Sequence, residues 1–182
     1  MRSSRLVLVL LLASLAGAAS AQSNKLQLGG YEQTLKLMEQ GKCNEARDKL
    51  MPNGRPRTGE EMEINDLGNC YIRAAKKISD PEDAERSRET GVGWILFAAN
   101  AGQREAAQDL VRLYLNGPVF FRDPYEAGKW YLLWEANHSQ IRLGQIEFDR
   151  DLQKQVNALS PEEWAEARAR LAKWKPTLIS AE

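Results

Sequence analysis

Two segments of the chain carry nearly the same pattern, and this repetition limits the folds that the sequence can adopt. GVGWILFAANAG (residues 91–102) and GKWYLLWEAN (residues 128–137) each place a tryptophan beside aliphatic and aromatic residues, followed by an alanine-asparagine pair. The two tryptophans, Trp94 and Trp130, are 36 residues apart (130 − 94). A period of this size is typical of helical hairpins that stack on one another, because a single hairpin cannot bury its own apolar face.

The second copy predicts two antiparallel helices. Asn116, Gly117 and Pro118 end the first helix, because glycine supplies a permissive backbone conformation and proline cannot continue a helix. Asp123 and Pro124 begin the second helix as N-cap and first helical residue. The apolar positions of the two helices recur at helical spacing: Ala106, Leu110, Leu113 and Tyr114, then Ala127, Trp130, Tyr131 and Trp134.

The first copy has the same order of features with an insertion. Residues 67–71 resemble residues 110–114, and residues 80–84 resemble residues 123–127, both at an offset of 43 (110 − 67 and 123 − 80). Because the tryptophans are offset by only 36, seven residues are inserted before Trp94. Seven residues make about two helical turns and keep the apolar stripe in phase. Gly91 and Gly93 weaken a helix, so a short loop is the alternative.

The motif Leu-Gly-x-Leu-Tyr, then Gly, then Asp-x-x-x-Ala-x-x-Trp-Tyr, then Ala-Ala-x-x-Gly, resembles the Sel-one-like repeat. The resemblance covers about residues 60 to 175 and implies an α-solenoid that assembles other proteins on a concave surface. The matching positions are Leu67, Gly68, Tyr71, Asp80, Ala84, Trp94, Ala98, Ala99 and Gly102, then Leu110, Leu113, Tyr114, Gly117, Asp123, Ala127, Trp130 and Tyr131. The departures are Ile95, Val111, Trp134, Glu135, His138 and Cys70, which stands where the family usually has a buried leucine.

The first residues predict a secretory signal peptide over residues 1–21. Arg2 and Arg5 precede a short apolar run, and Ala19-Ser20-Ala21 is a small-x-small cleavage site. The alternative is an uncleaved membrane anchor, which needs roughly 20 apolar residues. We therefore expect a bacterial protein in the periplasm or secreted space, with no membrane span after cleavage.

The rest of the chain is expected to flank the repeats with helices. Residues 22–59 predict a helical hairpin joined at Gly41-Lys42, followed by a loop over residues 52–59 rich in proline and arginine. The resemblance places two Sel-one-like repeats over residues 60–138. Residues 139–182 predict capping helices, one over residues 139–157 and a last one that begins with a capping box at Ser160 and ends before Pro176. The expected fold is all-α, a short α-solenoid of about eight helices.

Cys43 and Cys70 are the only cysteines of the chain. Paired cysteines in an exported protein usually form a disulfide, and a single histidine provides too few ligands for a zinc site. In the stacked register Cys43 begins the second helix of one hairpin, which lies against the first helix of the next hairpin, where Cys70 is placed. We expect a bridge that closes a loop of about 27 residues and contributes roughly 3 kcal/mol. Two buried free thiols are the alternative.

No set of residues predicts catalysis, a cofactor or a metal. His138 has no nucleophile among its neighbours, and Glu60, Glu61 and Glu63 lie where the dipole of a helix start favours acids. The tryptophans could bind sugars or peptides, but their spacing within the repeat favours the core. Without residues 1–21 the chain has 23 basic and 25 acidic residues, a net charge of −2 (23 − 25), spread without the basic stripe of a nucleic-acid-binding protein.

Phe120 and Phe121 are the candidate partner-binding residues, because they lie in a turn between helices where one can pack and the other can be exposed. The loop over residues 52–59 and the seven-residue insertion are further candidates, since such irregularities cluster on binding faces. We expect a non-enzymatic scaffold or adaptor with a protein partner in the cell envelope. The alternatives are an inhibitor of one exported enzyme and an enzyme that acts on the cell wall.

Overall fold

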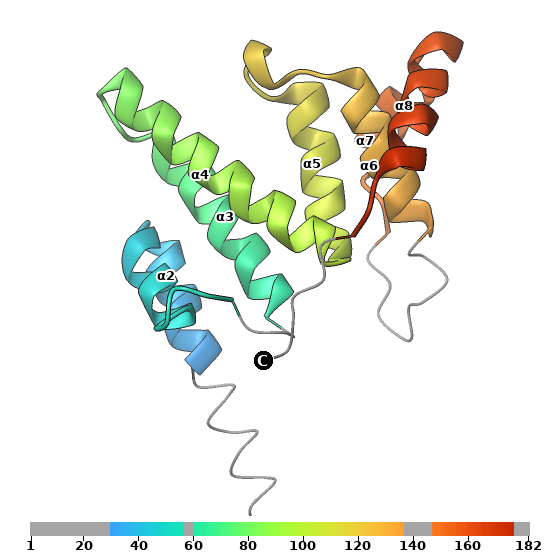
Figure 1. Cartoon of the computed structure of the whole chain (residues 1–182). Helices are drawn as coiled ribbons and strands as arrows, with labels where there is room; N and C mark the ends of the chain where they lie inside the picture. Colours follow the sequence, from blue (N-terminus) through green and yellow to red (C-terminus); the bar gives the residue numbers. More distant parts are fainter. Residues whose placement is uncertain (1–29, 57–59, 137–146, 177–182) are drawn as a thin grey trace, which may run out of the picture.

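Helices are the only regular structure in the part of the chain that the computed structural model describes, which is residues 30–56, 60–136 and 147–176. They comprise a helix over residues 30–39, seven further α-helices, α2 to α8, and one short 3-10 helix, η1 (Figure 1). The expectation of an all-α fold with about eight helices is therefore confirmed. The expected signal peptide, residues 1–21, lies outside the described residues.

The first hairpin pairs the helix over residues 30–39 with α2 (Cys43–Leu50). Between them Gly41 has a φ of 77°, in the left-handed region that favours glycine. Met38 and Leu50 are buried where this hairpin meets the rest of the chain. The hairpin, its turn and the position of Cys43 at the start of α2 agree with the sequence prediction.

The second hairpin consists of α3 (Glu61–Ala75) and α4 (Pro81–Asn100). α4 is one unbroken helix of 20 residues, so the inserted residues are helical and the loop alternative is wrong. Asp80 is its N-cap and accepts a hydrogen bond from the Asp83 N–H at 2.8 Å. α3 and α4 pack more extensively than any other pair of helices in the described chain.

Two glycines allow this close packing. A Cβ added at Gly91 of α4 would lie 2.6 Å from the carbonyl oxygen of Gly68, and one added at Gly68 of α3 would lie 2.7 Å from the carbonyl oxygen of Gly91. Only glycine lets the two backbones approach so closely. Gly93 differs, because a Cβ there would meet nothing within 4 Å.

The third hairpin consists of α5 (Arg104–Asn116), η1 (Val119–Phe121) and α6 (Pro124–Ala136). Its helix ends were predicted, but the expected role of Gly117 needs correction. Gly117 has a φ of −71°, which any residue can adopt. Glycine is required there for space, because a Cβ would lie 2.4 Å from the carbonyl oxygen of Leu113.

The chain continues with α7 (Arg150–Asn157) and α8 (Pro161–Lys173). The expected helix over residues 139–157 is wrong for residues 147–149, which are not helical, and its first eight residues lie outside the described chain. Asp149 sets the start of α7 by accepting hydrogen bonds from two backbone N–H groups of the first turn, at 2.9 and 3.1 Å. The predicted capping box of Ser160 and Glu163 is confirmed at the start of α8.

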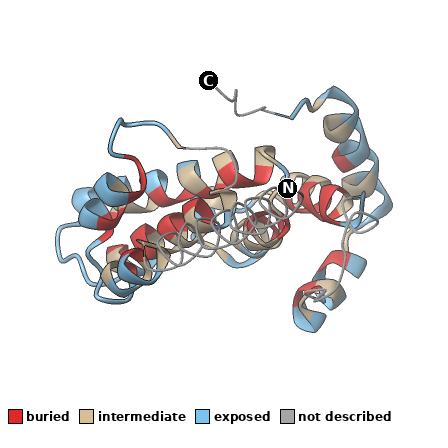
Figure 2. Cartoon of the chain, turned by 90° about the horizontal axis from the view of Figure 1, so that it is seen from below, coloured by how far each residue is buried: buried red, intermediate tan, exposed pale blue. Residues whose placement is uncertain are grey.

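Successive helices from α3 to α6 pack on one another in chain order, as expected of a short solenoid, and α8 then packs on α6 past the short α7. Buried residues lie where the helices meet (Figure 2). They form a large cluster over α3 to α7, which includes Trp130 and against which α8 packs, and a smaller one between the first hairpin and α3. Trp130 and Trp134 are buried, which agrees with their interpretation as core residues, and Trp94 packs against both clusters.

Candidate functional site

Two surfaces of the described chain stand out, an exposed apolar turn and a groove beside the disulfide. The turn between α5 and α6 holds Val119 and Phe120, which are 77% and 62% exposed and which we name the apolar knob. Phe121 is half-buried, with its ring centroid 4.7 Å from that of Phe120. The structure thus divides the two predicted phenylalanines into one exposed and one partly packed residue.

Hydrogen bonds hold the knob in one conformation. The Phe121 N–H donates to the carbonyl oxygen of Pro118 at 2.8 Å, and the Asp123 N–H donates to the carbonyl oxygen of Tyr114 at 3.1 Å. The Arg122 guanidinium closes the turn by donating from Nε to the carbonyl oxygen of Gly117 at 2.9 Å. A turn fixed in this way loses little conformational freedom when it binds a partner.

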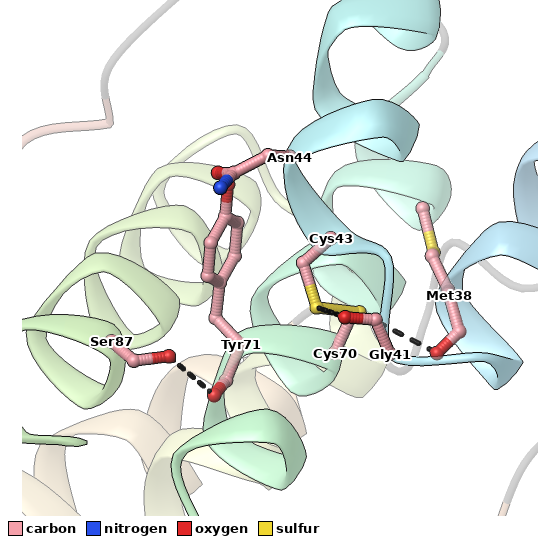
Figure 3. Close-up of a disulfide and its surroundings, with 7 residues drawn as sticks. All are labelled: Met38, Gly41, Cys43, Asn44, Cys70, Tyr71 and Ser87. Atoms are coloured by element: carbon pink, nitrogen blue, oxygen red, sulfur yellow. Dashed lines mark hydrogen bonds between the residues drawn. A yellow bond between two sulfur atoms is a disulfide. The ribbon is translucent and has the colours of Figure 1, made fainter. Parts of the chain in front are cut away.

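The disulfide between Cys43 of α2 and Cys70 of α3 joins the first hairpin to the second (Figure 3). Its Cα atoms are 5.8 Å apart, and both residues are buried. The expected bridge is therefore confirmed, and the alternative of two free thiols is wrong. Each sulfur lies 3.5 Å from a backbone carbonyl oxygen, that of Gly41 or Met38, and these are contacts without a donated proton because disulfide sulfurs carry none.

A groove of about 480 Å³ lies along this junction, and we name it the hairpin groove. One wall is the C-terminal end of the first helix with the start of α2. The other wall is the C-terminal part of α3, the residues that follow it, and Ser87 of α4. The lining residues are Met38, Glu39, Gln40, Gly41, Cys43, Asn44, Cys70, Tyr71, Arg73, Ala74, Lys77, Ile78 and Ser87.

Tyr71 ties three helices together at one side of the groove. Its hydroxyl donates to the Asn44 side-chain oxygen at 2.6 Å, and its carbonyl oxygen accepts from the Ser87 hydroxyl at 3.0 Å (Figure 3). Burial raises the pKa of the Tyr71 phenol, so the hydroxyl keeps the proton that it donates to Asn44.

A second polar contact joins the same two hairpins. The Tyr31 hydroxyl donates to a carboxylate oxygen of Asp66 at 3.1 Å. Burial, followed by the nearby Asp66 charge, raises the pKa of Tyr31 to about 12. Burial also raises the pKa of Asp66, against the opposing effect of the hydrogen bond from Tyr31. The first hairpin is thus held on α3 by the disulfide, a small apolar cluster and these two tyrosines.

The other residues considered from the sequence are not brought together into a catalytic set in the described chain. Glu60 is the N-cap of α3, and Glu61 and Glu63 lie in its first turn, where acids were expected. Burial, with smaller effects from neighbouring acids, raises the pKa of Glu63. No three histidine, cysteine, aspartate or glutamate side chains converge on a metal-sized position within the described segments. His138 lies outside them.

Sequence reasoning missed the hairpin groove and the residues that line it, notably Arg73, Lys77 and Ile78. The groove forms between two hairpins, and its residues carry no motif in either one. The one available signal was the short basic and apolar run RAAKKIS at the end of α3. The loop over residues 52–59, also considered as a binding element, is described only as far as Pro56.

No family model matches the chain, and neither a curated protein nor a solved structure matches it. Within the described segments, no helix has the length and apolar character needed to cross a membrane.

Proposed function

We propose that the chain is a non-enzymatic protein-interaction module of the Sel-one-like type, exported to the bacterial periplasm or secreted space. The apolar knob is its main contact with a protein partner. The observation that carries this proposal is the exposure of Val119 and Phe120 on a turn that hydrogen bonds hold in one conformation.

The free energy available at the knob is large enough for recognition. Fully burying a valine or phenylalanine side chain stabilises a complex by roughly 1.5–3 kcal/mol each. Side chains this exposed gain nothing comparable from the fold itself. An aromatic residue on a preformed turn is also a common anchor in protein interfaces.

The disulfide and the sequence of residues 1–21 support export. A buried disulfide that joins two hairpins is typical of proteins in oxidising compartments, since cytosolic thiols are kept reduced. The signal-peptide pattern is an independent indication of the same compartment.

The apolar knob lies on an edge of the molecule where turns of successive hairpins come together, an arrangement that fits the binding surface of an adaptor. The turn between α3 and α4 and the turn between α5 and α6 lie at the same end of the stack (Figure 1). Ile78, 36% exposed, lies beside the first of these turns, and the knob forms part of the second. A partner laid along this edge would contact successive hairpins, as solenoids commonly bind.

The test is capture of partners from a crosslinked cell envelope with the tagged mature protein, identified by mass spectrometry. We expect stoichiometric partners whose recovery falls at least tenfold with Phe120→Ser. The matched control is Met62→Ser, because Met62 is also an exposed apolar side chain, 49% exposed, but lies on α3. Both variants should keep the melting temperature of the wild type.

The outcome also separates the possible classes. Several partners would indicate an adaptor, whereas one partner in a 1:1 complex would indicate an inhibitor. Equal recovery of the same partners by the wild type and by Phe120→Ser would remove the knob from the proposal. A protein recovered without partners but with bound glycan would overturn the proposed function in favour of an enzyme or carbohydrate-binding protein.

A further inference from the structure

The hairpin groove combines an apolar floor with an uneven distribution of charge. Buried Met38 and the disulfide lie at its base, and Ala74 and Ile78 extend the apolar surface toward the solvent. Arg73 of α3 and Lys77, two residues after α3 ends, are the cations of one wall, and Glu39 is the one charged residue that lines the opposite wall.

The groove cations form no close ion pair in the described chain. Neither Arg73 nor Lys77 has an ion-pair partner within 4.0 Å there, whereas Arg88 on α4 is paired with Glu85 at 2.7 Å. Asp66, seven residues before Arg73 on α3, attracts Arg73 electrostatically at longer range and accepts a hydrogen bond from the Tyr31 hydroxyl. Because no close ion pair occupies them, the Arg73 guanidinium and the Lys77 ammonium can donate to an incoming carboxylate.

We propose that the hairpin groove binds a short acidic segment of a partner protein. An apolar side chain of that segment lies over Ala74 and Ile78, and an adjacent carboxylate faces Arg73 and Lys77. Charge complementarity favours an acidic segment and fixes its orientation. The carboxylate faces Arg73 and Lys77, because Glu39 would repel it from the opposite wall. The same glutamate and the apolar floor disfavour nucleic acid.

This site shares only Ile78 with the edge that carries the apolar knob, and it does not depend on Val119 or Phe120. The two walls belong to different hairpins, and the disulfide that joins these hairpins lies in the groove itself. The geometry of the groove therefore requires the oxidised protein, whereas the hydrogen bonds of the knob lie entirely within the third hairpin.

The test is a phage-display selection, in which a random heptapeptide library is selected for binding to the full, disulfide-bonded chain. We expect enrichment of peptides with one apolar residue beside one or more acidic residues. A synthetic consensus peptide should shift the methyl NMR signals of Ile78 and Ala74. Its variant with glutamine in place of each acid should bind at least tenfold more weakly.

Variants then test whether Arg73 and Lys77 recognise the acidic residues of the peptide. The double variant Arg73→Glu/Lys77→Glu should lose the consensus peptide at least tenfold and prefer a version with lysine in place of each acid. The matched control is Arg168→Glu/Lys173→Glu, which reverses two exposed cations of α8. This control should bind the consensus peptide like the wild type, and so should Phe120→Ser. The proposals for the groove and for the knob can therefore be refuted independently.

Three results would overturn the proposal. They are no enrichment of acidic peptides, equal binding of the acid and glutamine versions, and shifts that avoid Ile78 and Ala74. Competition by inorganic phosphate as effective as competition by unlabelled peptide would also overturn it, because it would identify a simple anion site.

Discussion

Tyr114 places its phenol in a half-buried position at the end of α5. Burial first, and then the charges of Glu126 and Asp123, raise its pKa to about 12 from the ordinary value of 10.0. The unfolded chain therefore loses this proton at lower pH than the folded chain. The contribution of Tyr114 to stability is complete below pH 10 and is lost as the pH rises through about 12.

We expect the free energy of unfolding to fall by roughly 2–3 kcal/mol from this residue between pH 10 and pH 12, since one pKa unit corresponds to about 1.4 kcal/mol. Chemical unfolding measured at several pH values checks the slope. Tyr114→Phe should flatten the slope in this range because it removes the titrating group. An unchanged slope in that variant would show that Tyr114 is not the group responsible.

At the scale of residues, the sequence predicted the disulfide better than it predicted which side chains form the exposed surfaces. The bridge between Cys43 and Cys70 followed from the compartment and the repeat register. The sequence did not decide which of Phe120 and Phe121 is exposed, because the 3-10 turn that orients them has no distinctive pattern. The groove cations Arg73 and Lys77 were not foreseen, because the opposite wall comes from another hairpin.

At the scale of elements, the contact between α3 and α4 depends on Gly91. A Cβ there would meet the backbone carbonyl oxygen of Gly68 at 2.6 Å, and backbone cannot move aside as a flexible side chain can. We expect Gly91→Ala to lower the free energy of unfolding by about 1–3 kcal/mol, the usual cost of overpacking. Urea unfolding followed by circular dichroism measures the change.

Gly93→Ala is the matched control, on the same helix and two residues away. A Cβ at Gly93 meets nothing within 4 Å, and the position is exposed. Alanine there should raise the free energy of unfolding by about 0.5–1 kcal/mol, because glycine is a poor helix former. Equal effects of the two variants would mean that helix propensity, and not the approach of the two backbones, determines the role of Gly91.

The order of helices was predictable because caps and breaks are local signals. Asp80, Asp123 and Ser160 mark three helix starts in the sequence, and all three are confirmed. The start of α7 was misjudged because apolar periodicity was extended past Asp149, which caps the helix. The sequence suggested that Gly91 weakens its helix. Its actual role, close contact with α3, could not be predicted because the contacting residue, Gly68, is far away in the sequence.

At the scale of the whole molecule, the chain has two apolar clusters of unequal size. The smaller cluster holds the first hairpin on α3, with members such as Met38 from the hairpin and Leu67 and Tyr71 from α3. α2 makes far less extensive contact with α3 than α4 does. The disulfide is the covalent link across this junction, whose apolar cluster is the smaller of the two.

We therefore expect reduction to release the first hairpin before the rest of the molecule unfolds. Hydrogen exchange of the reduced protein should show lost protection over residues 30–51, while α5, α6 and α8 remain protected. The oxidised protein is the control and should show protection in both regions. Uniform loss of protection along the reduced chain would contradict a weaker first junction.

The same junction determines how Cys70→Ala changes stability. The bridge closes a separation of 27 residues, and a loop of that size contributes about 3 kcal/mol in the chain-entropy model. We expect the variant to lower the melting temperature in oxidising buffer by roughly 6–12 °C. Alkylation of the unreduced wild type should modify neither cysteine, which verifies that the comparison starts from the bridged protein. A melting temperature equal to that of the wild type would mean that the apolar cluster alone holds the first hairpin, and the hairpin groove would then not depend on oxidation.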